Sequence, residues 1–304
     1  MSRKAIIDIG SNSIKFMVCD RAEDGTVLPV LDTNDIARLG EGLDKTGEIS
    51  PEAMERNVAA VAAFAAKAKE LGAEEIAAVG TMALRKAANS GEFIAKVQDA
   101  CGVTVQIIPG EEEARLSYLA VLSALPLGDA ELVIFDTGGG STEFIYGKGT
   151  ELKNRFSVNL GAVRITENFL AESPLSEEQV AAARAQIDSE FAAAGVTGAP
   201  KLVVGMGGTV TSMGAVKHKM VKYDPDVIQG STLTRADIAE QIEAYRTRTF
   251  EQRKELPGLQ PKRADVILAG ALILDVITDR LGVDGLTISD RGLRHGLAFD
   301  LFSK

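Results

Sequence analysis

The sequence is poor in residues that build disulfide-linked or histidine-based sites. Its 304 residues include two cysteines, two histidines and no tryptophan. Cys19 and Cys101 lie in or beside apolar segments, so we interpret them as small buried residues of a reducing compartment rather than as a disulfide framework. His218 and His295 are far apart and have no partners at ligand spacing. A histidine-based metal site or a catalytic triad is therefore not expected.

A membrane-spanning run and a basic charge balance are also missing. The longest apolar stretch, residues 266–274, is flanked by Asp265 and Asp275 and is shorter than the roughly 20 residues that cross a bilayer. Met1 leads into a polar triplet without a signal-peptide pattern. The formal net charge of −10 argues against a nucleic-acid partner, because such proteins present basic surfaces. We expect a cytoplasmic protein with no membrane and no nucleic-acid partner.

The length and the 45% hydrophobic content suit two domains of ordinary size. A short polar junction at residues 126–131 gives the predicted boundary. The first domain then covers residues 1–125 and the second residues 131–304. The C-terminal helix, about residues 291–304, is a candidate to pack back on the first domain.

Residues 132–145 read LVIFDTGGGSTEFI and predict a β-hairpin with a glycine-rich tip. Consecutive glycines leave backbone N–H groups free to bind phosphate oxygens, and neighbouring hydroxyls add donors. Acidic residues on both sides of the tip could hold a hydrated divalent cation. The phosphate-binding candidates are Gly138, Gly139, Gly140, Ser141 and Thr142, and the acids are Asp136 and Glu143. From this segment alone, a plain glycine-rich hairpin explains the pattern equally well.

A second copy of the pattern favours the phosphate interpretation. Residues 6–16 read IIDIGSNSIKF, and placing Asp8 on Asp136 also places Gly10 on Gly138 and Ser13 on Ser141. Such a repeat predicts two domains of like topology, each offering one phosphate loop to a shared cleft. The second loop adds the candidates Gly10, Ser11, Asn12 and Ser13, with Asp8 as a further metal candidate.

A third glycine turn follows the predicted strand 201–204, where Gly207, Gly208 and Thr209 precede a helix. Backbone N–H groups and the helix dipole make such a turn a seat for an anion. The segment lacks the last glycine of a dinucleotide-binding fingerprint, and the chain has no Walker A loop.

Two further candidates follow predicted strands of the first domain. Arg85 comes after the strand 76–79, and the acids 111–113 open the helix that follows the strand 103–108. Ligands of open α/β sheets collect at such strand ends. From the residues alone, Arg85 is an ordinary surface arginine, and acids in a first helical turn are what the helix dipole favours. The alternative is that one acid serves as a general base.

Together these motifs resemble the exopolyphosphatase and guanosine pentaphosphate phosphohydrolase family, which belongs to the superfamily of actin, sugar kinases and heat-shock ATPases. The resemblance implies an α/β fold of two actin-like (ribonuclease H-like) domains with a cleft between them. It covers nearly the whole chain, in the family's order. The matching segments are IDIGSNSIKFMV at 7–18, GTMALRKA at 80–87, PGEEEARLSYLAV at 109–121, IFDTGGGSTEF at 134–144, GMGGTVTSM at 205–213 and ISDRGLRHG at 288–296.

The resemblance also implies roles for single residues. Arg85 becomes a phosphate contact, and Glu113, the glutamate directly before the alanine of the motif, becomes the general base. The turn at Gly207 and Gly208 becomes the site of nucleotide or distal phosphates. The implied function is Mg²⁺-dependent hydrolysis of the terminal phosphate of inorganic polyphosphate, with Glu113, Arg85 and Glu143 as the catalytic residues.

Several alternatives remain open from the sequence. The substrate could instead be a phosphorylated guanine nucleotide, guanosine pentaphosphate (pppGpp), or another nucleoside triphosphate. A kinase-like phosphotransferase and a non-catalytic alarmone sensor are the other candidates. Longer family members carry additional helical domains, so we expect a short-form enzyme. A homodimer is compatible with these expectations.

Overall fold

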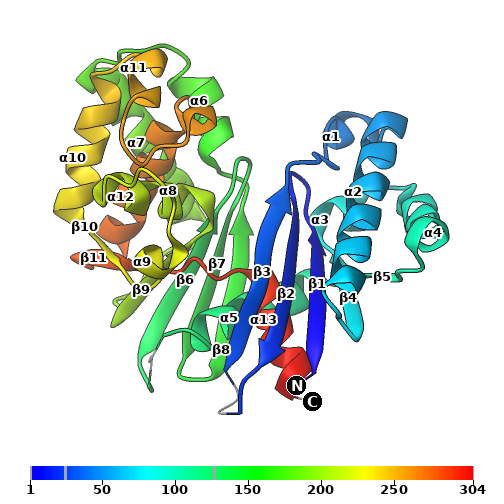
Figure 1. Cartoon of the computed structure of the whole chain (residues 1–304). Helices are drawn as coiled ribbons and strands as arrows, with labels where there is room; N and C mark the ends of the chain where they lie inside the picture. Colours follow the sequence, from blue (N-terminus) through cyan, green and yellow to red (C-terminus); the bar gives the residue numbers. More distant parts are fainter. Residues whose placement is uncertain (1, 24–25, 126–127, 304) are drawn as a thin grey trace. The chain divides into compact units, whose positions relative to one another are not determined.

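The computed structural model describes residues 2–23, 26–125 and 128–303. It divides into two compact units, Met1–Ser123 together with Leu293–Lys304, and Ala124–Gly292 (Figure 1). The predicted boundary at 126–131 includes residues 126 and 127, which lie outside the described residues.

The first unit contains a five-stranded sheet of order β3-β2-β1-β4-β5. Strands β1, β2 and β3 are antiparallel neighbours, whereas β4 and β5 run parallel to β1. Its elements are β1 (Arg3–Ile9), β2 (Ile14–Arg21), β3 (Val27–Asp35), α1 (Leu43–Thr46), α2 (Pro51–Glu70), β4 (Glu75–Gly80), α3 (Met82–Lys86), α4 (Ser90–Cys101), β5 (Val105–Ile107), α5 (Gly110–Leu122) and α13 (Leu293–Ser303).

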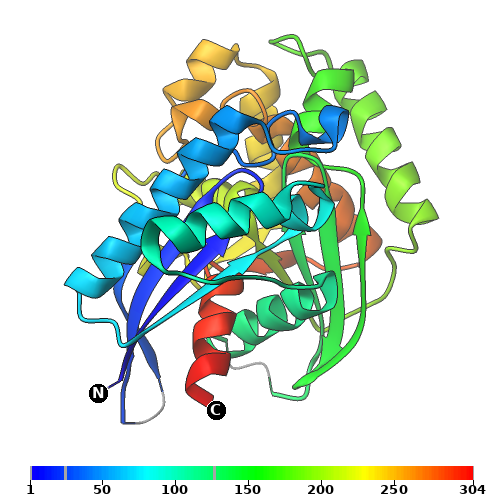
Figure 2. The same cartoon turned by 90° about the vertical axis from the view of Figure 1, so that its right-hand side faces the viewer.

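Both faces of this sheet are covered by apolar side chains. On one face, residues such as Ile7 and Phe16 pack with α2 and α4. Helix α2 begins at Pro51, where the Ser50 side chain caps it by accepting a hydrogen bond from Ala53 N. On the other face, Ile6 and Met17 pack with α5 and α13. Figure 2 shows α13, in red, beside α5.

The second unit contains a six-stranded sheet of order β10-β11-β9-β6-β7-β8. Strands β6, β7 and β8 are antiparallel neighbours, and β9 and β11 run parallel to β6. Its elements are β6 (Glu131–Thr137), β7 (Thr142–Lys148), β8 (Glu151–Val158), α6 (Ala162–Phe169), α7 (Glu177–Ala193), β9 (Leu202–Met206), α8 (Gly207–Lys217), α9 (Pro225–Ile228), β10 (Thr232–Thr234), α10 (Arg235–Arg246), α11 (Phe250–Lys254), a 3₁₀ turn (Pro261–Arg263), α12 (Ile267–Arg280) and β11 (Gly285–Ile288).

The core of the second unit is built on these strands and on α12. Phe144 lies at the centre of an aromatic group, with Phe156 stacked on it and Phe191 edge-on. Helix α12 is apolar and buried on nearly all sides. It begins at Ile267 and is preceded by the separate 3₁₀ turn Pro261–Arg263.

The two units repeat one topology. The order β3-β2-β1-β4-β5 corresponds to β8-β7-β6-β9-β11, with the same parallel and antiparallel pairings. The predicted α/β fold with a repeated topology is confirmed. In the part of the chain that the structure describes, no helix is both long and apolar enough to cross a bilayer.

Candidate functional site

In the first unit, the loop between β1 and β2 presents its backbone N–H groups outward. Gly10 N donates to Ser13 O at 3.1 Å and closes the turn, while the carbonyls of Ser11 and Asn12 accept from residues 40 and 38 at 2.8 and 3.0 Å. The N–H groups of residues 11–13 have no hydrogen-bond partner among the described residues. The loop therefore has the arrangement that an anion requires, with carbonyls turned into the protein.

The loop between β6 and β7 in the second unit has the same arrangement, with different partners. Gly138 N donates to Ser141 O at 2.9 Å, and the carbonyls of Gly138 and Gly139 accept from the first N–H groups of α6 at 2.9 to 3.3 Å. This contact requires Gly161, because a Cβ there would lie 2.5 Å from Gly139 C. The N–H groups of Gly139, Gly140 and Ser141 have no partner in the described part of the chain.

One predicted phosphate ligand needs correction. The Thr142 side chain is fully buried, and its hydroxyl donates to Leu160 O at 2.7 Å. Thr142 lies two residues before the buried Phe144 and shares its face of the strand. The hydroxyl therefore fixes the hairpin from inside and is not available to a ligand.

Asp8 and Asp136 occupy corresponding positions in the two hairpins, but the residues opposite them carry different charges. In the second unit, Asp136 lies directly opposite Glu143 across the ladder, so two carboxylates share one end of the hairpin. Glu143 accepts a hydrogen bond from Ser157 Oγ at 2.9 Å. In the first unit the opposite residue to Asp8 is Lys15, and its Nζ lies 3.2 Å from Asp8 Oδ2. The buried carboxylate of Asp8 thus already has a cation beside it. Its role as a metal ligand stays a prediction.

The pair Asp136 and Glu143 could hold a divalent cation. Among the described residues, no group of three or more His, Cys, Asp and Glu side chains could hold a metal on its own. Mg²⁺ in phosphoryl-transfer sites uses one or two carboxylates and completes its shell with water and phosphate oxygens. Two opposed carboxylates beside an anion loop supply that ligand set.

The turn before α8 lies against Asp136. A Cβ on Gly207 would be 2.1 Å from Asp136 Oδ1, so it would displace the carboxylate. The φ of +82° also favours glycine at this position. The helix begins at Gly207, which leaves the N–H groups of its first turn for a ligand. The side chain of Thr209 is buried against Gly270, so its backbone N–H is the group that can contribute.

Arg263 is a further candidate for the site, one that the sequence did not indicate. Its guanidinium rests on the glycine turn, because a Cβ on Gly208 would lie 2.0 Å from Arg263 Nη2. Burial lowers the pKa of this guanidinium, and no described carboxylate forms an ion pair with it. No sequence signal marked it, since its contact depends on a residue 55 positions away.

Arg85 and Glu113 meet in the first unit. Arg85 Nη1 donates to Glu113 Oε2 at 2.8 Å and to Ile108 O at 2.9 Å. Both residues follow carboxyl ends of neighbouring parallel strands, since β1 pairs with β4 and β4 with β5. Arg85 Nε and Nη2 have no partner in the described residues. The pair can therefore present donors and a carboxylate together.

The neighbouring glutamate has a different partner. Glu112 forms two hydrogen bonds with Arg115, at 2.7 and 2.8 Å, and Arg115 also reaches Asp300 on α13 at 2.9 Å. These carboxylates raise the pKa of Arg115. Glu112 therefore serves the packing of α13, whereas Glu113 is joined to a second predicted site residue.

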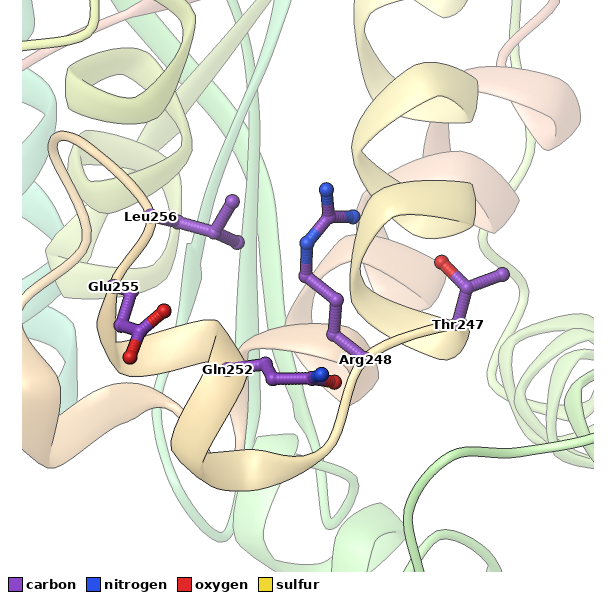
Figure 3. Close-up of a pocket in the computed structure, with 5 residues that line it drawn as sticks. All are labelled: Thr247, Arg248, Gln252, Glu255 and Leu256. Atoms are coloured by element: carbon purple, nitrogen blue, oxygen red, sulfur yellow. The ribbon is translucent and has the colours of Figure 1, made fainter.

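A pocket elsewhere in the second unit contains none of these residues. It is lined by Thr247, Arg248, Gln252, Glu255 and Leu256 (Figure 3). Arg248 Nη1 donates to Ala244 O at 2.8 Å, so this side chain secures the end of α10. The pocket lies outside the predicted site.

Comparison with known proteins identifies the family. A model of the Ppx/GppA phosphatase family matches residues 18–304. The chain belongs to the Ppx/GppA phosphatase family. Exopolyphosphatase 2 of Mycobacterium tuberculosis is 33% identical over 316 residues, which cover 99% of this chain and 99% of that protein. Exopolyphosphatase 1 of Mycobacterium leprae is 32% identical over 303 residues, which cover 97% of this chain and 88% of that protein.

The fold of the Ppx/GppA family is shared as well. The crystal structure of the Aquifex aeolicus family member superposes with a TM-score of 0.90 at 32% identity, covering 99% of this chain and 97% of that one. The family resemblance predicted from the motifs is thus confirmed by both comparisons.

Proposed function

We propose that this chain is an exopolyphosphatase, a hydrolase that releases orthophosphate from the end of inorganic polyphosphate. The observation that carries the proposal is the repeated loop, which in each unit turns its carbonyls inward and leaves three successive N–H groups for phosphate oxygens. The relatives named exopolyphosphatase match this chain over nearly its whole length, which supports the same substrate class.

The proposed reaction is attack of water on the terminal phosphorus. Glu113 takes a proton from the water, the bond from phosphorus to the bridging oxygen breaks, and this oxygen stays on the shortened chain. Arg85 holds Glu113 through Nη1 and offers Nε and Nη2 to the phosphoryl oxygens. The residues contribute positioning and charge, and no covalent intermediate is needed.

Mg²⁺ is the proposed ion, held by Asp136 and Glu143. When bound, it would neutralise charge on the phosphoryl oxygens and orient them for in-line displacement. Ser157 orients one Glu143 oxygen through its hydroxyl. Metal and side-chain cations are both needed locally, because the formal net charge of the chain is −10 and the substrate is a polyanion.

Arg263 and the turn at Gly207 and Gly208 are proposed to bind phosphates farther along the chain. Free N–H groups of a helix start and an unpaired guanidinium form a site for a phosphate that does not react. The proposed contact uses the backbone of Thr209, since its side chain is buried.

Phosphate release across four substrates tests the function. Tripolyphosphate, long polyphosphate, pppGpp and ATP are each incubated with Mg²⁺ and without any acceptor, and orthophosphate is measured. We expect release from both polyphosphates. Release confined to pppGpp or ATP would show a nucleotide phosphohydrolase, and release or transfer only with an added acceptor would show a phosphotransferase. A Glu113→Gln sample, prepared identically, controls for contaminating phosphatases.

A further inference from the structure

The segment that follows β3 is bonded to the phosphate loop of the first unit. Arg38 N donates to Asn12 O at 3.0 Å, and Gly40 N donates to Ser11 O at 2.8 Å. The approach at Gly40 is close, because a Cβ there would lie 3.1 Å from Ser11 Cβ. The backbone of Arg38 is therefore fixed next to the loop that carries these N–H groups.

The backbone of Arg38 has an unfavourable conformation for an arginine. Its φ is +47°, and only one other non-glycine residue of the described chain, Lys219 with φ of +49°, has a positive φ. Glycine adopts such angles without the penalty that a Cβ brings. The turn itself therefore does not explain why an arginine stands at this position.

The side chain of Arg38 has no structural partner either. It is exposed, and among the described residues it makes no hydrogen bond or ion pair. The adjacent Arg56 differs sharply, because it donates to Ala37 O at 2.7 Å and pairs with Glu41 at 3.1 Å. Arg56 holds the segment in place, and the charge of Arg38 is left for a ligand.

We propose that Arg38 is a substrate-binding residue that donates to phosphoryl oxygens held by the loop 10–13. This inference rests on the proposed function for the identity of the anion, a phosphate chain. An arginine at this place adds charge-assisted donors to N–H groups that carry only partial charge. Arg38 takes no part in proton transfer, so its loss should affect binding rather than the chemical step.

The test compares Arg38→Gly with Lys219→Gly. Each substitution removes one cation and relieves one positive φ, but Lys219 follows the C-terminal end of α8, where its N–H donates to Val216 O at 3.0 Å. We expect Arg38→Gly to raise KM for tripolyphosphate about tenfold, the effect of one lost charge-assisted hydrogen bond, with kcat nearly unchanged. Its thermal unfolding temperature should equal or exceed that of the wild type. Lys219→Gly should keep the wild-type KM.

Two outcomes would overturn the proposal. One is a folded Arg38→Gly protein with the wild-type KM, and the other is an equal rise in KM for both variants, which would show an effect of net charge. If the wild type releases no phosphate, the proposed function fails. The binding role of Arg38 is then tested separately, by calorimetric measurement of tripolyphosphate binding. Weaker binding by Arg38→Gly than by Lys219→Gly would then support the inference, and equal or absent binding would contradict it.

Discussion

Adjacent side chains of the same type have different roles here because their partners differ. Glu112 and Glu113 both lie in the first turn of α5, where any acid is favoured by the helix dipole. Glu112 is bonded to Arg115, whereas Glu113 is bonded to Arg85. Residue type and helix position cannot separate them, since the deciding arginine is 28 positions from Glu113, and only the family resemblance pointed to Glu113.

The Glu113→Gln substitution tests this distinction. The amide can still accept the hydrogen bond from Arg85, so the fold should be retained, but it cannot take a proton from water. We expect orthophosphate release to fall about 100-fold or more, the contribution of a general base, with an unchanged circular dichroism spectrum. Glu112→Gln is the matched control and should keep most activity. Near-normal turnover by Glu113→Gln would remove Glu113 from the role.

Some site residues were predictable from the sequence and others were not. The carboxylate pair Asp136 and Glu143 follows from the position of the glycine turn between two apolar runs. The burial of Thr142 was also readable, because it shares strand parity with Phe144. Arg263 was not readable, since only the folded second unit brings it to Gly208.

The start of α8 shows how a secondary-structure element positions a side chain of a neighbouring strand. Its start at Gly207 places a Cα so close to Asp136 that a Cβ would overlap the carboxylate at 2.1 Å. The proposed metal ligand is thus positioned by the start of a helix that follows another strand. A substitution at Gly207 should therefore weaken metal binding, although Gly207 is not itself a proposed metal ligand.

Gly207→Ala is the corresponding prediction. The new Cβ must displace the Asp136 carboxylate, so we expect a several-fold higher Mg²⁺ concentration for half-maximal hydrolysis. The positive φ should also lower the free energy of unfolding by about 1 kcal/mol. Gly282→Ala is the control, because it has φ of +63° and open space around its Cβ. For both variants, the Mg²⁺ dependence of hydrolysis is measured by titration and the free energy of unfolding by denaturant unfolding. Equal Mg²⁺ dependence in the two variants would contradict a metal role for Asp136.

The predictions of secondary structure were most accurate in segments where buried and exposed residues alternate clearly. Both glycine hairpins were predicted and are present. Strand β3 was not predicted, because it is an edge strand with mostly exposed residues and a proline at position 29. The last helix begins at Leu293, so Arg291 lies ahead of it rather than on it.

Across the whole chain, the C-terminal helix belongs to the first unit. Arg294 forms two hydrogen bonds with Asp32 on β3, at 2.7 and 2.9 Å. Burial alone would raise the pKa of Asp32, but His295 and Arg294 together lower it. Lys4 Nζ donates to Leu301 O at 3.1 Å. These pairs join residues more than 250 positions apart, so periodicity and spacing could not assign the partners of α13.

The contact of α13 with α5 should control access to Cys19. Cys19 is fully buried beneath α13, and burial raises the pKa of its thiol to about 12, so the native thiol should react slowly. A Cβ on Gly296 would lie 1.8 Å from the carbonyl oxygen of Leu116, which is backbone and cannot move aside. Such overpacking costs about 1–3 kcal/mol, so α13 should open more often.

We therefore expect Gly296→Ala to raise the labelling rate of Cys19 by a thiol reagent about tenfold or more. The measurement uses a Cys101→Ser background, so that Cys19 is the single thiol. Gly91→Ala in α4 is the control, because its new Cβ meets nothing within 4 Å and the rate should stay at that of the background. Equal labelling rates in the two variants would show that Cys19 is protected by the sheet itself and not by the packing of α13.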